Sequence, residues 1–152
     1  RPQVETLFAG SHVTLVPQSS RDTAMSVMTA AIACSGTITT QLASWGVPTV
    51  VVYRVSPLTY FAAKRLFLQR YVSLVNISAD LNTPGGSDPL MPEYLQKAAF
   101  GDEPIDALSQ FIVGGDAVEG LRERLKQETR HMGVGSEKAS DKAAEAILKR
   151  IA

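Results

Sequence analysis

The fold of this chain is decided by residues 34–54, which read CSGTITTQLASWGVPTVVVYR. The pattern is the end of a strand, a turn of small residues, a helix over 37–45 that ends at a Gly-Val-Pro break, and a second apolar strand. The first turn of such a helix leaves backbone N–H groups unpaired at the positive end of its dipole. The turn at Ser35-Gly36-Thr37 therefore predicts a phosphate site, although the same residues also suit a plain helix cap.

The segments on either side continue this alternation of apolar strands and helices. Strands are predicted at 12–17, 30–34, 49–53 and 71–77, and helices at 22–29 and 58–68. Such an alternation requires a parallel sheet with right-handed crossovers. We therefore expect an α/β protein with a Rossmann-like parallel sheet and helices on both faces.

The pattern changes near residue 82, where a loop rich in glycine and proline begins. Further helices are predicted from near Pro92, over 105–113, from Asp116 to near Gly133, and over 136–151. Asp116 and Glu119 have the spacing of a capping box. The terminal helices are amphipathic, so they require an apolar surface to pack on.

Composition narrows the function classes. The 152 residues carry 15 basic and 15 acidic side chains, so no overall field attracts nucleic acid. The single cysteine, Cys34, excludes an internal disulfide and a multi-cysteine zinc site, and its apolar strand predicts a buried, inert thiol. No segment has the roughly 20 apolar residues that cross a bilayer. The chain begins at Arg1 rather than methionine, which favours a fragment of a longer protein.

Three polar residues follow or close predicted strands. They are Ser35, Arg54 and Asn76. Ligands of open parallel sheets collect beyond the carboxyl ends of the strands, so we expect all three to face one crevice. Each also has an ordinary explanation: a cap for Ser35, a solvated surface position for Arg54 and turn chemistry for Asn76.

Several motifs, in the same order, resemble the carboxyl-terminal half of lipid-A-disaccharide synthase, a GT-B-type glycosyltransferase family. They lie at residues 35–37, 46–48, 53–60, 63–66 and 71–76, and a Pro-Glu-Tyr-Leu-Gln segment follows at 92–96. The most distinctive is the Tyr-Arg-x-x-Pro run that begins at Tyr53. The resemblance covers about residues 10–100 of this chain.

The resemblance implies a reaction and a division of the chain. The family transfers diacylglucosamine from a UDP-linked donor to a monosaccharide phosphate acceptor, lipid X, and releases UDP. Because GT-B enzymes hold the donor in their carboxyl-terminal domain, residues 1–104 are expected to form a nucleotide-sugar-binding domain. Residues 105–152 are expected to form a helical extension that packs on this domain, on a missing half or on a partner subunit. The family chemistry implies no cofactor and no metal.

The resemblance also implies the roles of site residues. The N–H groups of the turn would cradle the diphosphate, Arg54 would neutralise it, Asn76 would reach the donor, and Glu93 and Gln96 would lie near the ribose or sugar. The expected substrate-binding set is Ser35, Gly36, Thr37, Gln41, Tyr53, Arg54, Asn76, Glu93 and Gln96. The general base is expected in the amino-terminal half, so no catalytic residue is assigned.

The chain departs from the family pattern at three places. Gln41 stands where many GT-B donor domains have a glutamate, Val75 replaces a usual proline, and the loop at 82–90 is long and rich in glycine. Two alternatives therefore remain: the donor domain of another UDP-N-acetylglucosamine-using GT-B transferase, and a non-catalytic UDP-sugar-binding or assembly module.

The resemblance sets expectations for partners and location. The expected partners are a UDP-sugar donor and an acylated glucosamine phosphate acceptor, with no nucleic acid. A basic and aromatic stretch at 54–70 favours a packed helix with a solvated edge, and peripheral contact with a membrane is the alternative. A homodimer through the terminal helices is also expected. The expected location is cytoplasmic and peripheral to the inner membrane, or organellar in a plastid-bearing eukaryote.

Overall fold

Three short parallel strands form the sheet of the computed structural model, which describes residues 2–56, 70–134 and 139–151. In chain order the elements are α1 (Pro2–Leu7), η1 (Gln18–Ser20), α2 (Arg21–Ser26), β1 (Ala31–Ala33), α3 (Thr37–Ser44), β2 (Thr49–Tyr53), α5 (Leu74–Asn82), β3 (Glu93–Leu95), η2 (Gln96–Phe100), α6 (Glu103–Val113), α7 (Asp116–His131) and α8 (Ala139–Ile151). The helix expected at 58–68 lies outside the described residues.

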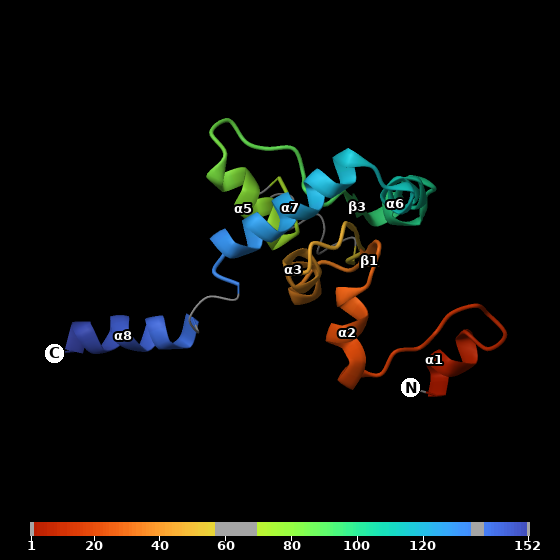
Figure 1. Ribbon diagram of the computed structural model, residues 1–152, viewed down its shortest axis with the longest axis horizontal. Coiled ribbons are helices and arrows are strands. Elements are labelled where there is room, and N and C mark those ends of the chain that lie inside the picture. The colour runs from red at the N-terminus through yellow and green to blue at the C-terminus, as the bar shows by residue number, and fades with distance from the viewer. Residues whose placement is uncertain (1, 57–69, 135–138, 152) are drawn as a thin grey trace.

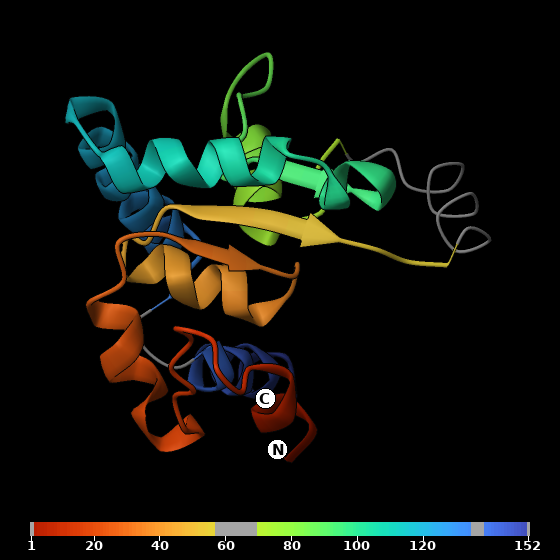
Figure 2. The ribbon, with the colours of Figure 1, turned by 90° about the vertical axis from the view of Figure 1, so that its right-hand side faces the viewer.

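The strands are parallel and lie in the order β1-β2-β3 (Figure 2). Strand β2 is central, with Ala31 paired to Thr49 on one side and Val51 paired to Glu93 on the other. Val50 and Val51 are fully buried, as expected for a central strand covered on both faces.

Helices cover both faces of this sheet (Figure 1). Helices α3, α5 and α7 lie on one face, and α6 lies on the other, where it contacts β2. The main core joins Ala43, Val51, Val75, Met91 and Leu125, which come from α3, β2, α5, the segment before β3, and α7. The expected α/β fold, with a parallel sheet between helices, is confirmed.

Arg122 of helix α7 forms hydrogen bonds to the amino-terminal edge of the sheet. Its guanidinium donates to the carbonyl oxygens of Thr29 (2.7 Å) and Gly46 (3.2 Å), which precede β1 and β2. Gly46 has a φ of +70°, and a Cβ there would lie 2.6 Å from Lys126 Cε and 3.1 Å from the Arg122 carbonyl oxygen. This close approach requires glycine.

The strand expected at 12–17 is wrong. Residues 13–17 form no regular element, and Val13 and Val16 are 50% and 51% exposed. A β-branched run becomes a strand only where it pairs with a neighbour and packs against a surface. In the part of the chain that the structure describes, this run does neither.

Two other expected elements are wrong. The apolar run at 71–77 was expected to be a strand, but it enters α5, because Ser73 caps the helix and its Oγ accepts a hydrogen bond from the Asn76 N–H. The helix expected from near Pro92 is β3 instead, because the Pro92 carbonyl accepts a hydrogen bond from the Val51 N–H at the start of the ladder.

The remaining helices follow the sequence closely. Helix α6 covers the expected 105–113, α7 ends two residues before Gly133, and α8 lies within 136–151. Gly115, rather than Asp116, occupies the N-cap of α7, and no side-chain capping bond forms there. Figure 1 shows α8 extending away from the helices around the sheet. The division between residues 104 and 105 stays a prediction.

Candidate functional site

The carboxyl edge of the sheet brings together most of the residues expected to bind substrate. Ser35 follows β1, Arg54 follows β2 and Gln96 follows β3. Glu93 is the first residue of β3, and Asn76 lies in the first turn of α5. Because all three strands run in the same direction, Ser35, Arg54 and Gln96 lie along the carboxyl edge of the sheet, whereas Glu93 enters β3 opposite Val51.

The turn between β1 and α3 is open to solvent. Gly36 occupies the N-cap of α3 with a φ of +149° and makes no side-chain capping bond. Gly36 and Thr37 are exposed, and a Cβ at position 36 would meet nothing within 4 Å. On the inner side, Thr39 Oγ1 donates to the Gly36 carbonyl (2.7 Å) and orders the turn. The backbone of the turn is therefore ordered and approachable.

Asn76 and Glu93 bind each other and the chain around them. Asn76 is fully buried; its Nδ2 donates to the Met91 carbonyl (2.7 Å) and to Glu93 Oε1 (2.8 Å), while its Oδ1 accepts from the Met91 N–H (3.0 Å). The Glu93 carboxylate also accepts from the N–H groups of Val72 (2.7 Å) and Ser73 (2.8 Å). Both side chains thus have partners inside the chain, and their direct contact with a donor stays a prediction.

A second group surrounds the end of β2. The Gln96 side-chain amide accepts from the Val55 N–H (3.1 Å) and donates to the Val55 carbonyl (3.2 Å), which holds Gln96 at an uncommon φ of 57°. The exposed Arg54 guanidinium lies over the Phe100 ring, 5.3 Å from its centroid. Tyr53 is 36% exposed at the end of the strand. Gln96 is therefore tied to β2, while Arg54 faces solvent.

Two further residues complete the edge. Gln41 is half-buried on α3, one turn beyond Thr37. Cys34 was expected to be a buried thiol, but it is exposed. The reason is that β1 ends at Ala33, so Cys34 belongs to the open turn rather than to the strand.

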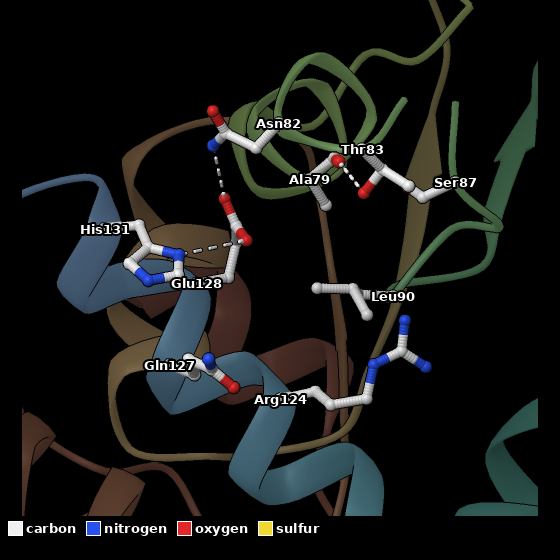
Figure 3. Close-up of a pocket in the computed structure, with 9 residues that line it drawn as sticks. All are labelled: Ala79, Asn82, Thr83, Ser87, Leu90, Arg124, Gln127, Glu128 and His131. Carbon is white, nitrogen blue, oxygen red and sulfur yellow. Dashed lines mark hydrogen bonds and ion pairs between the residues drawn. The ribbon is translucent and has the colours of Figure 1, made fainter. Parts of the chain in front are cut away.

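A separate pocket of about 220 Å³ lies between α5 and α7 (Figure 3). It is lined by residues that include Asn82, Arg124, Glu128 and His131. Glu128 Oε1 accepts from Ser78 Oγ (2.5 Å) and Asn82 Nδ2 (3.4 Å), and Glu128 Oε2 lies 3.9 Å from His131 Nδ1. The pocket lies at the far end of α5 from Asn76. The sequence signal for it is Glu128, an acidic residue on the inner, apolar stripe of α7.

A helix-covered parallel sheet with polar side chains at its carboxyl edge defines a Rossmann-like domain. Residues 2–148 match the family model described as lipid-A-disaccharide synthetase. The chain therefore belongs to the lipid-A-disaccharide synthase family of glycosyltransferases, which serves lipid A biosynthesis.

Several relatives carry the name lipid-A-disaccharide synthase. The one from Rhodospirillum centenum is 33% identical over 91% of this chain and 33% of its own length. Those from Vibrio campbellii and Pseudomonas fluorescens are 37% and 33% identical, over 86% and 99% of this chain and 32% and 37% of their own lengths. This chain thus spans about a third of the relatives it matches. No solved structure matches it.

Among residues 2–56, 70–134 and 139–151, no helix is both long enough and apolar enough to pass through a membrane.

Proposed function

We propose that this chain is the donor-binding part of a lipid-A-disaccharide synthase and holds the diphosphate of a UDP-linked diacylglucosamine. The observation that carries the proposal is the exposed, uncapped turn at the start of α3, which follows β1, while Arg54 follows the neighbouring strand β2 at the same edge of the sheet. Unpaired N–H groups at the positive end of a helix and a guanidinium are the two groups that proteins most often direct at phosphate oxygens.

The strand register supports one shared phosphate site. Ala33 pairs with Val51, so Gly36 and Arg54 each lie three positions beyond paired residues. Neighbouring strands are separated by about 4.8 Å, a spacing that allows one diphosphate to contact both. Stacking on Phe100 holds the guanidinium at this edge without neutralising its charge. Arg54 and the turn would then stabilise UDP as the leaving group.

The other expected residues take supporting places in this proposal. Gln41, on α3, and Tyr53, the last residue of β2, are partly exposed and are proposed to contact the ribose or sugar. An amide such as Gln41 offers both a donor and an acceptor to ribose hydroxyls. Gln96 is proposed to orient the end of β2, since the oxygen of its side-chain amide accepts from the Val55 N–H and the NH₂ group donates to the Val55 carbonyl.

The whole reaction requires more than this chain. We propose that the part of a family-length protein without a counterpart here supplies the general base and the site for lipid X. Transfer of diacylglucosamine to lipid X would then form the lipid A disaccharide and release UDP. Because both sugars are acylated, we place the assembled enzyme at the cytoplasmic surface of a membrane, as a homodimer through the terminal helices.

Calorimetric titration of the purified chain with UDP, ADP and GDP tests the donor site. We expect UDP to bind more tightly than ADP or GDP. Arg54→Ala should weaken UDP binding, while Arg124→Ala, at an exposed arginine of the α5–α7 pocket, should leave it unchanged. Equal affinity for UDP and ADP, or equal losses in the two variants, would contradict the proposal.

A second experiment separates an enzyme part from a binding module. The chain would be joined to the amino-terminal two-thirds of a relative and supplied with the UDP-linked donor and lipid X. Disaccharide formation is expected. UDP binding without product would favour a non-catalytic module instead.

A further inference from the structure

We infer that Glu93 is a positioning residue: it holds the N-terminus of α5 and, through Val72, sets the turn that is proposed to bind the diphosphate. This inference rests on the proposed function. It assigns Glu93 a role different from the direct ribose or sugar contact that the family resemblance implies.

Glu93 acts as the anion at the start of α5. Its two carboxylate oxygens accept three hydrogen bonds, from the N–H groups of Val72 and Ser73 and from Asn76 Nδ2, at 2.7 to 2.8 Å. The first turn of α5 contains no acidic residue of its own. The negative charge that a helix N-terminus favours is therefore delivered from β3.

Val72 connects Glu93 to the turn after β1. The Val72 N–H donates to Glu93 Oε2 (2.7 Å), and the Val72 carbonyl accepts from Ser35 Oγ (3.0 Å). One residue thus links the third strand to the loop that leaves the first. A change in the Glu93 carboxylate moves Val72, and Val72 carries that movement to Ser35.

The N-termini of α5 and α3 differ in whether a carboxylate of the chain already occupies them. The N-terminus of α5 is filled by a carboxylate of the chain itself. The N-cap of α3 makes no side-chain capping bond, and its first turn also lacks an acidic residue. A substrate phosphate would be repelled from α5 by Glu93 and accepted at α3. The N-terminus of α3, whose turn Glu93 orients through Val72, is therefore the one that stays open to a phosphate.

The test compares UDP with uridine, which lacks phosphate, in wild type, Glu93→Gln, Ser35→Ala and the double variant. An amide cannot accept all three hydrogen bonds, because its NH₂ group faces N–H donors. We expect Glu93→Gln to weaken UDP binding by about five- to tenfold while uridine binding is unchanged, a change of the size that the loss of one ordinary hydrogen bond produces. In the Ser35→Ala background the same change should have no further effect.

A control variant at a surface site of α6 accompanies the test. Ser109→Ala removes an exposed hydroxyl of α6 that donates to the Ile105 carbonyl, and it should change neither affinity. Should Glu93→Gln not fold, Glu93→Asp replaces it in both backgrounds, since it keeps the charge and shortens the reach. Equal losses for UDP and uridine would mean direct ribose contact and would overturn the inference. If the losses of UDP affinity caused by Glu93→Gln and Ser35→Ala multiply in the double variant, the inference is overturned as well. If wild type does not prefer UDP to uridine, the proposed function itself fails.

Discussion

Replacing Asn76 by alanine probes the buried contact between α5 and β3. The substitution removes two hydrogen bonds to the Met91 backbone and one to the Glu93 carboxylate. Bonds of this kind contribute about 1 kcal/mol each, and about 2 kcal/mol when one partner is charged. Met91 is fully buried, so water cannot replace the lost partner. We therefore expect the free energy of unfolding to fall by about 4 kcal/mol.

Urea unfolding measures this loss directly. Trp45 is the only tryptophan of the chain and follows α3, so its fluorescence reports on the sheet and its helices. Leu74→Ala is the matched control, because Leu74 lies in the same helical turn and is 53% exposed. The control should change the free energy of unfolding by less than about 0.5 kcal/mol. A loss below about 1 kcal/mol for Asn76→Ala would refute the reasoning, because it would mean that the three bonds do not hold β3 to α5.

Three further predictions concern the turn, a close packing contact and a surface pair. Saturating UDP should slow maleimide labelling of Cys34, the only cysteine, and an unchanged rate would argue against phosphate binding at the adjacent turn. Gly46→Ala should lower the free energy of unfolding by about 1 kcal/mol more than Gly85→Ala. Both glycines have positive φ, but only a Cβ at position 46 meets other atoms, and equal losses would contradict this. Lys126→Ala should raise the pKa of Glu123 towards its usual value in an NMR titration, because the hydrogen bond and charge of Lys126 lower it. The contribution of this exposed pair is present at neutral pH and disappears as the pH falls through the pKa of Glu123; an unchanged pKa would contradict the assignment.

The sequence pattern correctly predicts those helices and strands whose ends are determined by neighbouring residues in the chain. Helix α3 and strand β2 follow from the Gly46 and Pro48 break and the valine run after it, and the structure confirms both. The run at 71–77 could not be read in the same way. A short apolar segment suits a strand or a buried helix equally, and here Ser73 and the distant Glu93 decide for the helix.

The candidate site was predictable to a similar extent. Ser35 and Arg54 each follow a predicted strand. Because a parallel sheet brings the carboxyl ends of its strands together, both residues were expected at one edge. The mutual bonding of Asn76 and Glu93 was not predictable, since it joins residues 17 positions apart and depends on where β3 begins. The pocket beside Glu128 escaped prediction because its partner Ser78 is 50 positions away.

The Arg122 contact has a consequence for how the chain assembles during synthesis. Its two bonds reach back 76 and 93 positions, to the residues that precede β2 and β1. On a ribosome those strands emerge long before Arg122 does. Strands β1 and β2 can therefore pair early, but the contact that anchors them to α7 forms only after Arg122 has been translated. Contacts over such long separations also slow folding, so a helix outside the sheet limits how early the first two strands become fixed.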